Sequence, residues 1–156
     1  MLVANATSFD DELVEALRQF APDTPLVALD AGFELELSEL DPEDRAEFMS
    51  EFGTEESGLD RLTRTAFDLL GLISFYTVAK SKLQAWEIPQ GTPASVAAGK
   101  IHSDMEEGFI RAKVASADEL VEVGSLKEVQ AQGHVRTVGR DPEIEDGDVV
   151  EFLFSG

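Results

Sequence analysis

The chain has 156 residues, of which 43% are apolar and ten are phenylalanine, and this is enough for one or two folded domains with a hydrophobic core. Its formal charge of −20 repels phosphate at long range, so we do not expect a broad electrostatic contact with nucleic acid. The absence of cysteine excludes disulfides, thiolate catalysis and cysteine-bound metals. The sequence contains no apolar run of about eighteen residues, so no membrane span is predicted. Because the N-terminus lacks the basic start of a signal peptide, we expect a cytoplasmic protein.

The charge is divided unevenly along the chain. Residues 1–71 contain 18 acidic and 4 basic side chains, a net charge of −14, and residues 72–156 contain 14 acidic and 8 basic, a net charge of −6. Any contact with RNA is therefore expected to be local and to use the less acidic second part. Gly71 is the predicted boundary between two domains.

The first 31 residues predict half of an α/β unit. Residues 2–4 and 25–31 are apolar and typical of buried strands, and residues 10–20 carry apolar side chains at helical spacing. Ser8 or Asp10 is the expected cap of this helix. A helical crossover of this length favours parallel pairing of the two strands.

Two further helices are expected before the boundary. Residues 41–53 begin with Asp41 as a cap and Pro42 in the first turn, and the second helix covers residues 57–72. On the second helix Arg61 and Arg64 are interpreted as solvated side chains.

The second part predicts a small mixed sheet with one helix lying across it. The helix begins with Thr92 as its cap and Pro93 at its first position, carries its apolar side chains on one face, and ends at Gly108. Apolar and alternating segments predict the strands, and these lie at residues 72–78, 83–88, 109–115, 134–139 and 148–156. The predicted class is α+β, with a β-grasp (ubiquitin-like) domain at 72–156 preceded by a partial α/β segment with helices at 1–71.

Several motifs in residues 72–156 carry a family resemblance. They are LISFYTV (72–78), AWEI (85–88), GT (91–92), AAGKIHSD (97–104), GFIRAKV (108–114) and DGDVVEFLF (146–154). In this order they resemble the TGS domain, and in particular the C-terminal half of the YchF/Obg-like ATPase family. The resemblance implies attachment to translation, with a ribosome, RNA or a translation-associated protein as partner.

The first part also resembles that family, from the last strands of its GTPase domain onward. LVANATS is similar to the strand that ends in the base-recognition motif Asn-x-x-Glu, with Asn5 retained and Ser8 in the place of the glutamate. LVALDAGFELEL is similar to the next strand and loop. The resemblance implies a weak remnant of a nucleotide site at Asn5, Asp30, Ala31 and Gly32.

The sequence contains no G-x-x-x-x-G-K-[ST] motif, so it has no phosphate-binding loop of that kind and no lysine for the β/γ-phosphates. We therefore expect a non-catalytic protein without a cofactor, although the full-length family implies a nucleoside triphosphatase. The alternative is a residual ATP- or GTP-binding fragment that needs a separate chain carrying the P-loop.

For partner binding the candidates are basic and aromatic side chains of the second part: Lys80, Lys82, Trp86, Lys100, His102, Arg111 and Lys113. Arg111 and Lys113 are two residues apart on a strand and so share a sheet face, where ordinary solvation is the alternative to binding. No metal site is expected, because the only two histidines, His102 and His134, lie 32 residues apart.

The first function that we predict is a non-catalytic adaptor that docks through its β-grasp surface. A further prediction, compatible with it, is homo-oligomerisation, since half of an α/β sheet leaves an unpaired edge and apolar faces that need cover.

Overall fold

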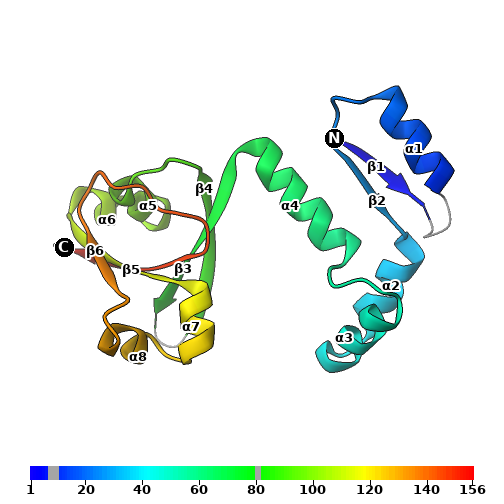
Figure 1. Cartoon of the computed structure of the whole chain (residues 1–156). Helices are drawn as coiled ribbons and strands as arrows, with labels where there is room; N and C mark the ends of the chain where they lie inside the picture. The colour runs from blue at the N-terminus through cyan, green and yellow to red at the C-terminus, as the bar shows by residue number, and fades with distance from the viewer. Residues whose placement is uncertain (7–10, 80–81) are drawn as a thin grey trace. The chain divides into compact units, whose positions relative to one another are not determined.

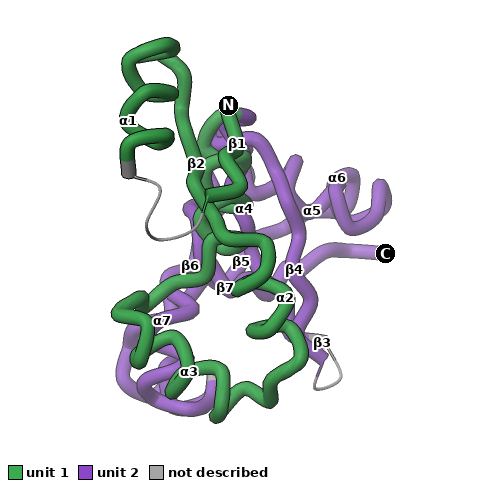
Figure 2. Tube along the Cα trace, turned by 90° about the vertical axis from the view of Figure 1, so that its right-hand side faces the viewer, with its two compact units in different colours: residues 1–69 green, residues 70–156 purple. Residues whose placement is uncertain are grey.

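The computed structural model describes residues 1–6, 11–79 and 82–156, which form two compact units. Unit 1 comprises Met1–Leu69 and unit 2 comprises Leu70–Gly156 (Figure 2). The predicted helix caps Ser8 and Asp10 and the candidate Lys80 lie outside the described residues.

Unit 1 begins with two parallel strands joined by a helix (Figure 1). The strands β1 (Leu2–Asn5) and β2 (Leu26–Leu29) pair in register from Leu2 opposite Leu26 to Asn5 opposite Leu29, and the helix α1 spans Asp11–Phe20. The parallel pairing is as predicted, because a ten-residue helix between the strands returns the chain to the same end of the sheet.

The second strand is shorter than predicted, and a helix that was not predicted follows it. Helix α2 spans Ala31–Glu39, where the sequence was interpreted as the end of a strand and a loop. The physical reason is Asp30, whose Oδ1 accepts the N–H groups of Gly32 (2.9 Å) and Phe33 (3.2 Å) and so caps the helix at its first turn.

Helices α3 (Pro42–Glu51) and α4 (Gly58–Leu70) complete the first part of the chain. Asp41 occupies the predicted cap position of α3, but its side chain makes no capping hydrogen bond. The rings of Phe33, Phe48 and Phe52 pack together, with centroids 4.9–5.4 Å apart, and join α2 to the end of α3.

The buried apolar core of unit 1 is small. Among its described residues the buried apolar side chains are those of Ala4, Ala6, Val27 and Leu37. Large apolar side chains remain on the surface, including Phe20 (84% exposed) and Leu35 (62% exposed). The amphipathic patterns of α1 and α4 therefore lead only to partial burial of their apolar side chains within this unit.

Unit 2 contains a mixed five-stranded sheet in the order β4-β3-β7-β5-β6. The central strands β3 and β7 are parallel, and the other neighbours are antiparallel. The strands span Leu72–Ala79 (β3), Lys82–Pro89 (β4), Phe109–Ser116 (β5), Arg136–Val138 (β6) and Asp148–Phe154 (β7).

One face of this sheet is covered by helix α5 (Ala94–Ile101), with Phe75 fully buried at the centre of the core. Alternate side chains of each strand point into this core, as period-two patterning requires. Its other buried members include Ile73, Ile88, Ala97, Ala98, Ala112, Val114 and Val150. Two short helices, α7 (Ala117–Val123) and α8 (Leu126–Ala131), connect β5 to β6.

The predicted single helix of unit 2 is broken at His102, which has an extended backbone with φ −160° and ψ 139°. A second helix, α6 (Ser103–Glu107), follows, and the Nδ1 atom of His102 accepts the N–H of Asp104 at 3.2 Å. Gly99 allows the Glu106 side chain of α6 to pack closely against α5, because a Cβ at this position would collide with that side chain. The helix also begins one residue later than predicted, with Pro93 at its N-cap, while the Thr92 hydroxyl donates to the carbonyl of Pro89.

Across residues 1–6, 11–79 and 82–156, no helix combines the length and apolar character that a membrane span requires.

Candidate functional site

The four residues of the predicted nucleotide-site remnant lie together where β1 ends and α2 begins. The Oδ1 atom of Asn5 accepts the N–H of Ala31 at 3.0 Å, and Asp30 accepts the N–H of Gly32. These polar groups therefore bind one another: Asn5 holds the start of α2 in place across 26 residues of sequence.

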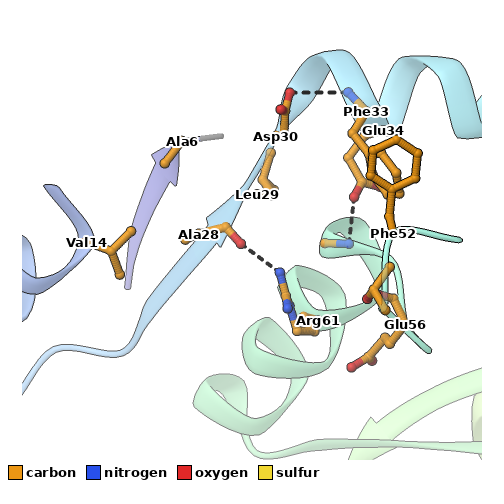
Figure 3. Close-up of a pocket in the computed structure, with 12 residues that line it drawn as sticks. Ala6, Val14, Ala28, Leu29, Asp30, Phe33, Glu34, Phe52, Glu56 and Arg61 are labelled. Carbon is orange, nitrogen blue, oxygen red and sulfur yellow. Dashed lines mark hydrogen bonds between the residues drawn. The ribbon is translucent and has the colours of Figure 1, made fainter. Parts of the chain in front are cut away.

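A cavity of about 340 Å³ lies beside this loop within unit 1 (Figure 3). Asp30 is the member of the predicted set that lines it, together with the rings of Phe33 and Phe52 and the charged side chains of Glu56 and Arg61. A cavity with aromatic walls and a few polar groups has the general character of a small-molecule site.

Glu34 lines the same cavity and was not among the predicted site residues. It is 8% exposed, and its two carboxylate oxygens accept the N–H groups of Gly58 (2.6 Å) and Leu59 (3.4 Å). A carboxylate at this point interacts favourably with the positive end of the α4 dipole. The contact joins residues 24 positions apart, so no local pattern in the sequence indicates it.

Arg61 also has a role that sequence analysis missed. Its Nη2 atom donates to the carbonyl oxygen of Ala28 on β2 at 2.8 Å (Figure 3), so the side chain is exposed, as expected of a solvated residue, but is also anchored to the strand. Arg64 lies 2.7 Å from a carboxylate oxygen of Glu56, although its side chain is 70% exposed.

The second candidate lies on the face of the unit 2 sheet opposite α5. Ala112 and Val114 point into the core. Arg111 and Lys113 alternate with them along the strand and therefore point to the other face. Lys113 Nζ is 3.0 Å from Glu151 Oε2 on the neighbouring strand, whereas Arg111 is exposed and forms no ion pair with a described residue. The sequence-based pairing of Arg111 and Lys113 on one sheet face thus agrees with the strand register.

The same face continues into an apolar area on β3 and β4. Val78 pairs with Leu83 and Tyr76 pairs with Ala85 across these strands, and Val78 and Leu83 are 40% and 63% exposed. We call this surface the open face and define it by eight side chains: Tyr76, Val78, Leu83, Ala85, Arg111, Lys113, Glu151 and Leu153. It combines exposed apolar side chains with one basic side chain that no described acid neutralises.

The other predicted partner-binding residues lie away from the open face. Trp86 packs against the core and its indole N–H donates to Thr77 Oγ1 at 3.0 Å. Lys82 is exposed on β4 but has the opposite strand parity to Leu83. Trp86, which is packed, and Lys82, which is solvated, therefore both lie on the side of β4 that faces the core rather than on the open face.

Lys100 and His102 belong to the helical side of unit 2. Lys100 Nζ lies 3.0 Å from Glu87 Oε1, and this hydrogen bond lowers the pKa of Glu87. The backbone N–H of Asp104 donates to His102 Nδ1, and the Asp104 carboxylate lies 3.5 Å from the same nitrogen. The seven predicted residues therefore do not form one surface.

The DGD motif of residues 146–148 has a structural role. Asp146 Oδ1 accepts the N–H of Ser74 at 2.8 Å, and Gly147 has a φ of +79°, which favours glycine. Asp148 accepts two hydrogen bonds from Arg136 Nη2, at 3.0 and 2.9 Å, and a third from the N–H of Glu145. These contacts fix the start of β7 between β3 and β5.

Within the Arg136–Asp148 pair the two partners experience different environments. Asp148 has a side chain that is only 7% exposed, and burial raises its pKa above the ordinary value of 3.8 although Arg136 opposes the shift. Desolvation lowers the pKa of Arg136, but Asp148 and Glu145 outweigh it and the net shift is upward. The half-exposed Arg136 guanidinium is stabilised in its charged form by two nearby carboxylates. The buried Asp148 carboxylate loses hydration, and its hydrogen bonds and the charge of Arg136 do not compensate fully for that loss.

Among the residues that the structure describes there is no group of three or more histidine and acidic side chains arranged to hold a metal ion.

Comparisons with known proteins agree with this architecture. Residues 72–155 match the family model YchF-GTPase_C, described as a protein of unknown function (DUF933). The chain is 42% identical over 130 residues to the ribosome-binding ATPase YchF of Escherichia coli O157:H7, covering 83% of this chain and 36% of that protein. It is 35% identical over 147 residues to the protein of the same name from Bacillus subtilis, covering 93% of this chain and 40% of that protein.

The fold is shared with a solved structure as well. The YchF GTPase of Schizosaccharomyces pombe superimposes with a TM-score of 0.73 at 24% identity, covering 94% of this chain and 39% of that chain. An α/β unit followed by a helix-covered mixed sheet is thus the architecture of a known class of GTPase-related proteins. The chain belongs to the YchF family and matches its C-terminal part. It spans 36–40% of the length of the two relatives named above.

Proposed function

We propose that this chain is a non-catalytic docking module that binds the ribosome through the open face of unit 2. The support is of two kinds. Relatives that share 35–42% identity with this chain are named ribosome-binding ATPases, and the shared region includes the sheet of unit 2. The sequence itself carries no G-x-x-x-x-G-K-[ST] motif, the loop that holds the β/γ-phosphates in P-loop nucleoside triphosphatases.

The proposal includes a finer description of the fold. We infer that residues 72–156 form a β-grasp (ubiquitin-like TGS) domain. The sheet order β4-β3-β7-β5-β6, the parallel pairing at its centre and the position of α5 across one face support this assignment. In this arrangement one sheet face is used for the core. The opposite face is covered where Ala115 and Val149 are buried beside α8, and the open face is the remaining part that is available to a partner.

The observation that carries the proposed function is the composition of the open face. Exposed Val78 and Leu83 lie on the same face as Arg111, which forms no ion pair with a described residue. Apolar side chains exclude water from a contact, while arginine is suited to phosphate or carboxylate groups. A ribosomal surface offers RNA phosphate and protein side chains together, which fits this mixture better than a uniformly charged ligand.

Co-sedimentation with purified ribosomes at moderate salt tests the proposal. The chain is expected to pellet with ribosomes and to remain in the supernatant without them. Because the net charge is −20, the binding should depend only weakly on salt, unlike binding through a large basic patch. A chain that stays in the supernatant at every ribosome concentration would contradict the proposal. Ribosome binding also implies a cytoplasmic protein.

A second candidate function is residual nucleotide binding in unit 1. The observation that favours it is the grouping of Asn5 and Asp30 at the start of α2, beside the 340 Å³ cavity. In this proposal a separate P-loop-bearing chain supplies the phosphate contacts. Calorimetry should then detect ATP or GTP binding only in a mixture of the two chains, and an absence of heat in that mixture excludes the proposal.

Self-association is a further part of the proposal that the surface of unit 1 supports. Phe20 and Leu35 are largely exposed, and exposed apolar groups of this size favour association. Light scattering should then show a mass above that of the 17.0 kDa chain, and a clean monomer would contradict this part.

A further inference from the structure

The basic residues of unit 1 are few and are concentrated in one place. Four of its residues are basic, all of them arginine, against 18 acidic residues. Three of the four, Arg18, Arg61 and Arg64, line a single hollow of about 420 Å³. In a unit with a net charge of −14, such a concentration of positive charge is a marked local exception.

The hollow is built from three elements of unit 1. Arg61, Arg64 and Thr65 share one face of α4, because they are three and four positions apart. Arg18 comes from the last turn of α1, and the backbone of β2 at residues 26–28 lies between the two helices. Residues from distant parts of the sequence thus converge on the same space.

The guanidinium groups differ in how firmly they are held. Arg61 is anchored by its 2.8 Å hydrogen bond to Ala28, which fixes the direction of its remaining donors (Figure 3). Arg64 lies 2.7 Å from Glu56, a residue that also lines the hollow. The nearer carboxylate oxygen of Glu56 is buried and lacks a well-aligned hydrogen bond. The hollow therefore already contains one anionic group that contacts an arginine without ideal geometry.

We propose that this hollow binds a phosphate group, with Arg18, Arg61 and Arg64 as its ligands. Guanidinium groups present forked donors that match phosphate oxygens, and several of them around one cavity give both affinity and orientation. The bound phosphate competes with Glu56 for Arg64. This hollow adjoins the 340 Å³ cavity and shares Ala28, Glu56 and Arg61 with it, but Asn5 and Asp30 do not line the hollow. Phosphate binding here does not depend on ribosome docking by unit 2.

The surrounding acidic residues limit the affinity but do not remove the site. Their repulsion acts over distance and is screened beyond about 8 Å at physiological salt, whereas the arginines contact the ligand directly. The phosphate can belong to a small molecule or to a nucleic-acid backbone, since both offer the same oxygens. The affinities for AMP and for RNA distinguish these two sources.

The test uses the full chain and four probes: inorganic phosphate, pyrophosphate, AMP and a short single-stranded RNA. Binding is followed by NMR chemical-shift changes at about 0.15 M salt, with probe concentrations up to about 10 mM. The wild-type chain should show saturable shifts at the amides of α4 and β2. An absence of saturable shifts with all four probes would overturn the proposal.

Substitutions then identify the ligands of the phosphate. Arg18→Ala and Arg64→Ala should each weaken binding about tenfold or more, since each removes a charge-assisted hydrogen bond. Arg64→Lys, which keeps the charge but loses the fork, should weaken it as well, and Glu56→Gln should strengthen it by removing the competing carboxylate. Unchanged affinity in Arg18→Ala and Arg64→Ala would overturn the proposal.

The matched control is Arg45→Ala, because Arg45 is the fourth arginine of unit 1 and donates to Leu37 outside the hollow. It should bind the probes like the wild type, and an equal loss in this variant would indicate only a general charge effect and contradict the proposal. Fold integrity is checked from the dispersion of the unaffected amides. RNA binding much tighter than AMP binding assigns the site to a nucleic-acid backbone, and similar affinities assign it to small phosphates.

Discussion

The Glu34 carboxylate accepts the N–H of Gly58 at 2.6 Å and thereby joins the first turn of α2 to the first turn of α4. Glu34 is one of few buried charged residues in the described structure, and the N–H groups at the start of α4 have no partner within the helix. The carboxylate satisfies those donors and is in turn satisfied by them. The pair is therefore a structural link between two helices rather than a reactive acid.

Replacing Glu34 by alanine should destabilise unit 1. The substitution leaves the Gly58 and Leu59 N–H groups without their acceptor, and a loss of about 2 kcal/mol in the free energy of unfolding is expected. Hydrogen exchange at these two amides measures the effect directly. Glu36→Ala is the matched control, since Glu36 is on the same helix but exposed, and equal effects of the two substitutions would contradict this account.

Gly58 should tolerate no side chain. A Cβ at this position would lie 2.5 Å from the Cβ of Leu29 and 2.9 Å from Glu34 Oε1, so Gly58→Ala is expected to cost about 1–3 kcal/mol despite the better helix propensity of alanine. Urea unfolding of unit 1 followed by NMR checks this value. Gly139→Ala is the control, because open space surrounds that glycine; a neutral Gly58→Ala would show that α4 is not packed as described.

Asp148 should produce a pH dependence opposite in sign to that of an ordinary salt-bridged acid. Burial raises its pKa in the folded state above 3.8, so the folded chain holds this proton more tightly than the unfolded chain. The contribution to stability is complete below the unfolded-state pKa and is lost as the pH rises through the folded-state pKa. The wild-type free energy of unfolding, minus that of Asp148→Asn, should decrease as the pH rises from the ordinary value of 3.8 through the folded-state pKa.

Urea unfolding of the wild type and of Asp148→Asn at several pH values gives this difference. The pH-dependent contributions of the other acidic groups cancel in it, because both proteins contain those groups. A difference that increases over the same range would mean that Arg136 outweighs burial and lowers the pKa of Asp148.

The surface ion pair between Lys113 and Glu151 should contribute little. Glu151 is 62% exposed, and exposed pairs of this kind are worth about 0–1 kcal/mol. Lys113→Met should therefore change the free energy of unfolding by less than about 1 kcal/mol, with the largest effect at low salt. A larger loss, measured by urea unfolding, would show that the pair holds β5 and β7 together.

The strands and their faces follow from local sequence, because alternation fixes which side chains share a face. The placement of Arg111 and Lys113 opposite Ala112 and Val114 needed nothing more than this period of two. The break at His102 was not visible in the same way. It accompanies the close packing of the Glu106 side chain against Gly99, which is a contact between two helices and leaves no periodic signal.

The sites of unit 1 depend on tertiary structure to a greater extent. The three-residue spacing of Arg61 and Arg64 is visible in the sequence, but their meeting with Arg18 requires the packing of α1, β2 and α4. Similarly, Asp30 was expected to lie in a loop, and its role as a helix cap became evident only from its hydrogen bonds. Local patterns thus predict elements, and the convergence of side chains follows from how those elements pack.

The central claim is that the open face of unit 2 contacts the ribosome, and the dissociation constant of ribosome co-sedimentation for face-specific variants tests it most directly. Leu83→Glu and Arg111→Glu alter the open face at exposed positions, whereas Lys100→Glu makes the same change of sign as Arg111→Glu on the helix that covers the opposite face. We expect each open-face variant to bind at least about tenfold more weakly and Lys100→Glu to bind like the wild type. Equal affinities for all four chains, or a loss confined to Lys100→Glu, would contradict the claim.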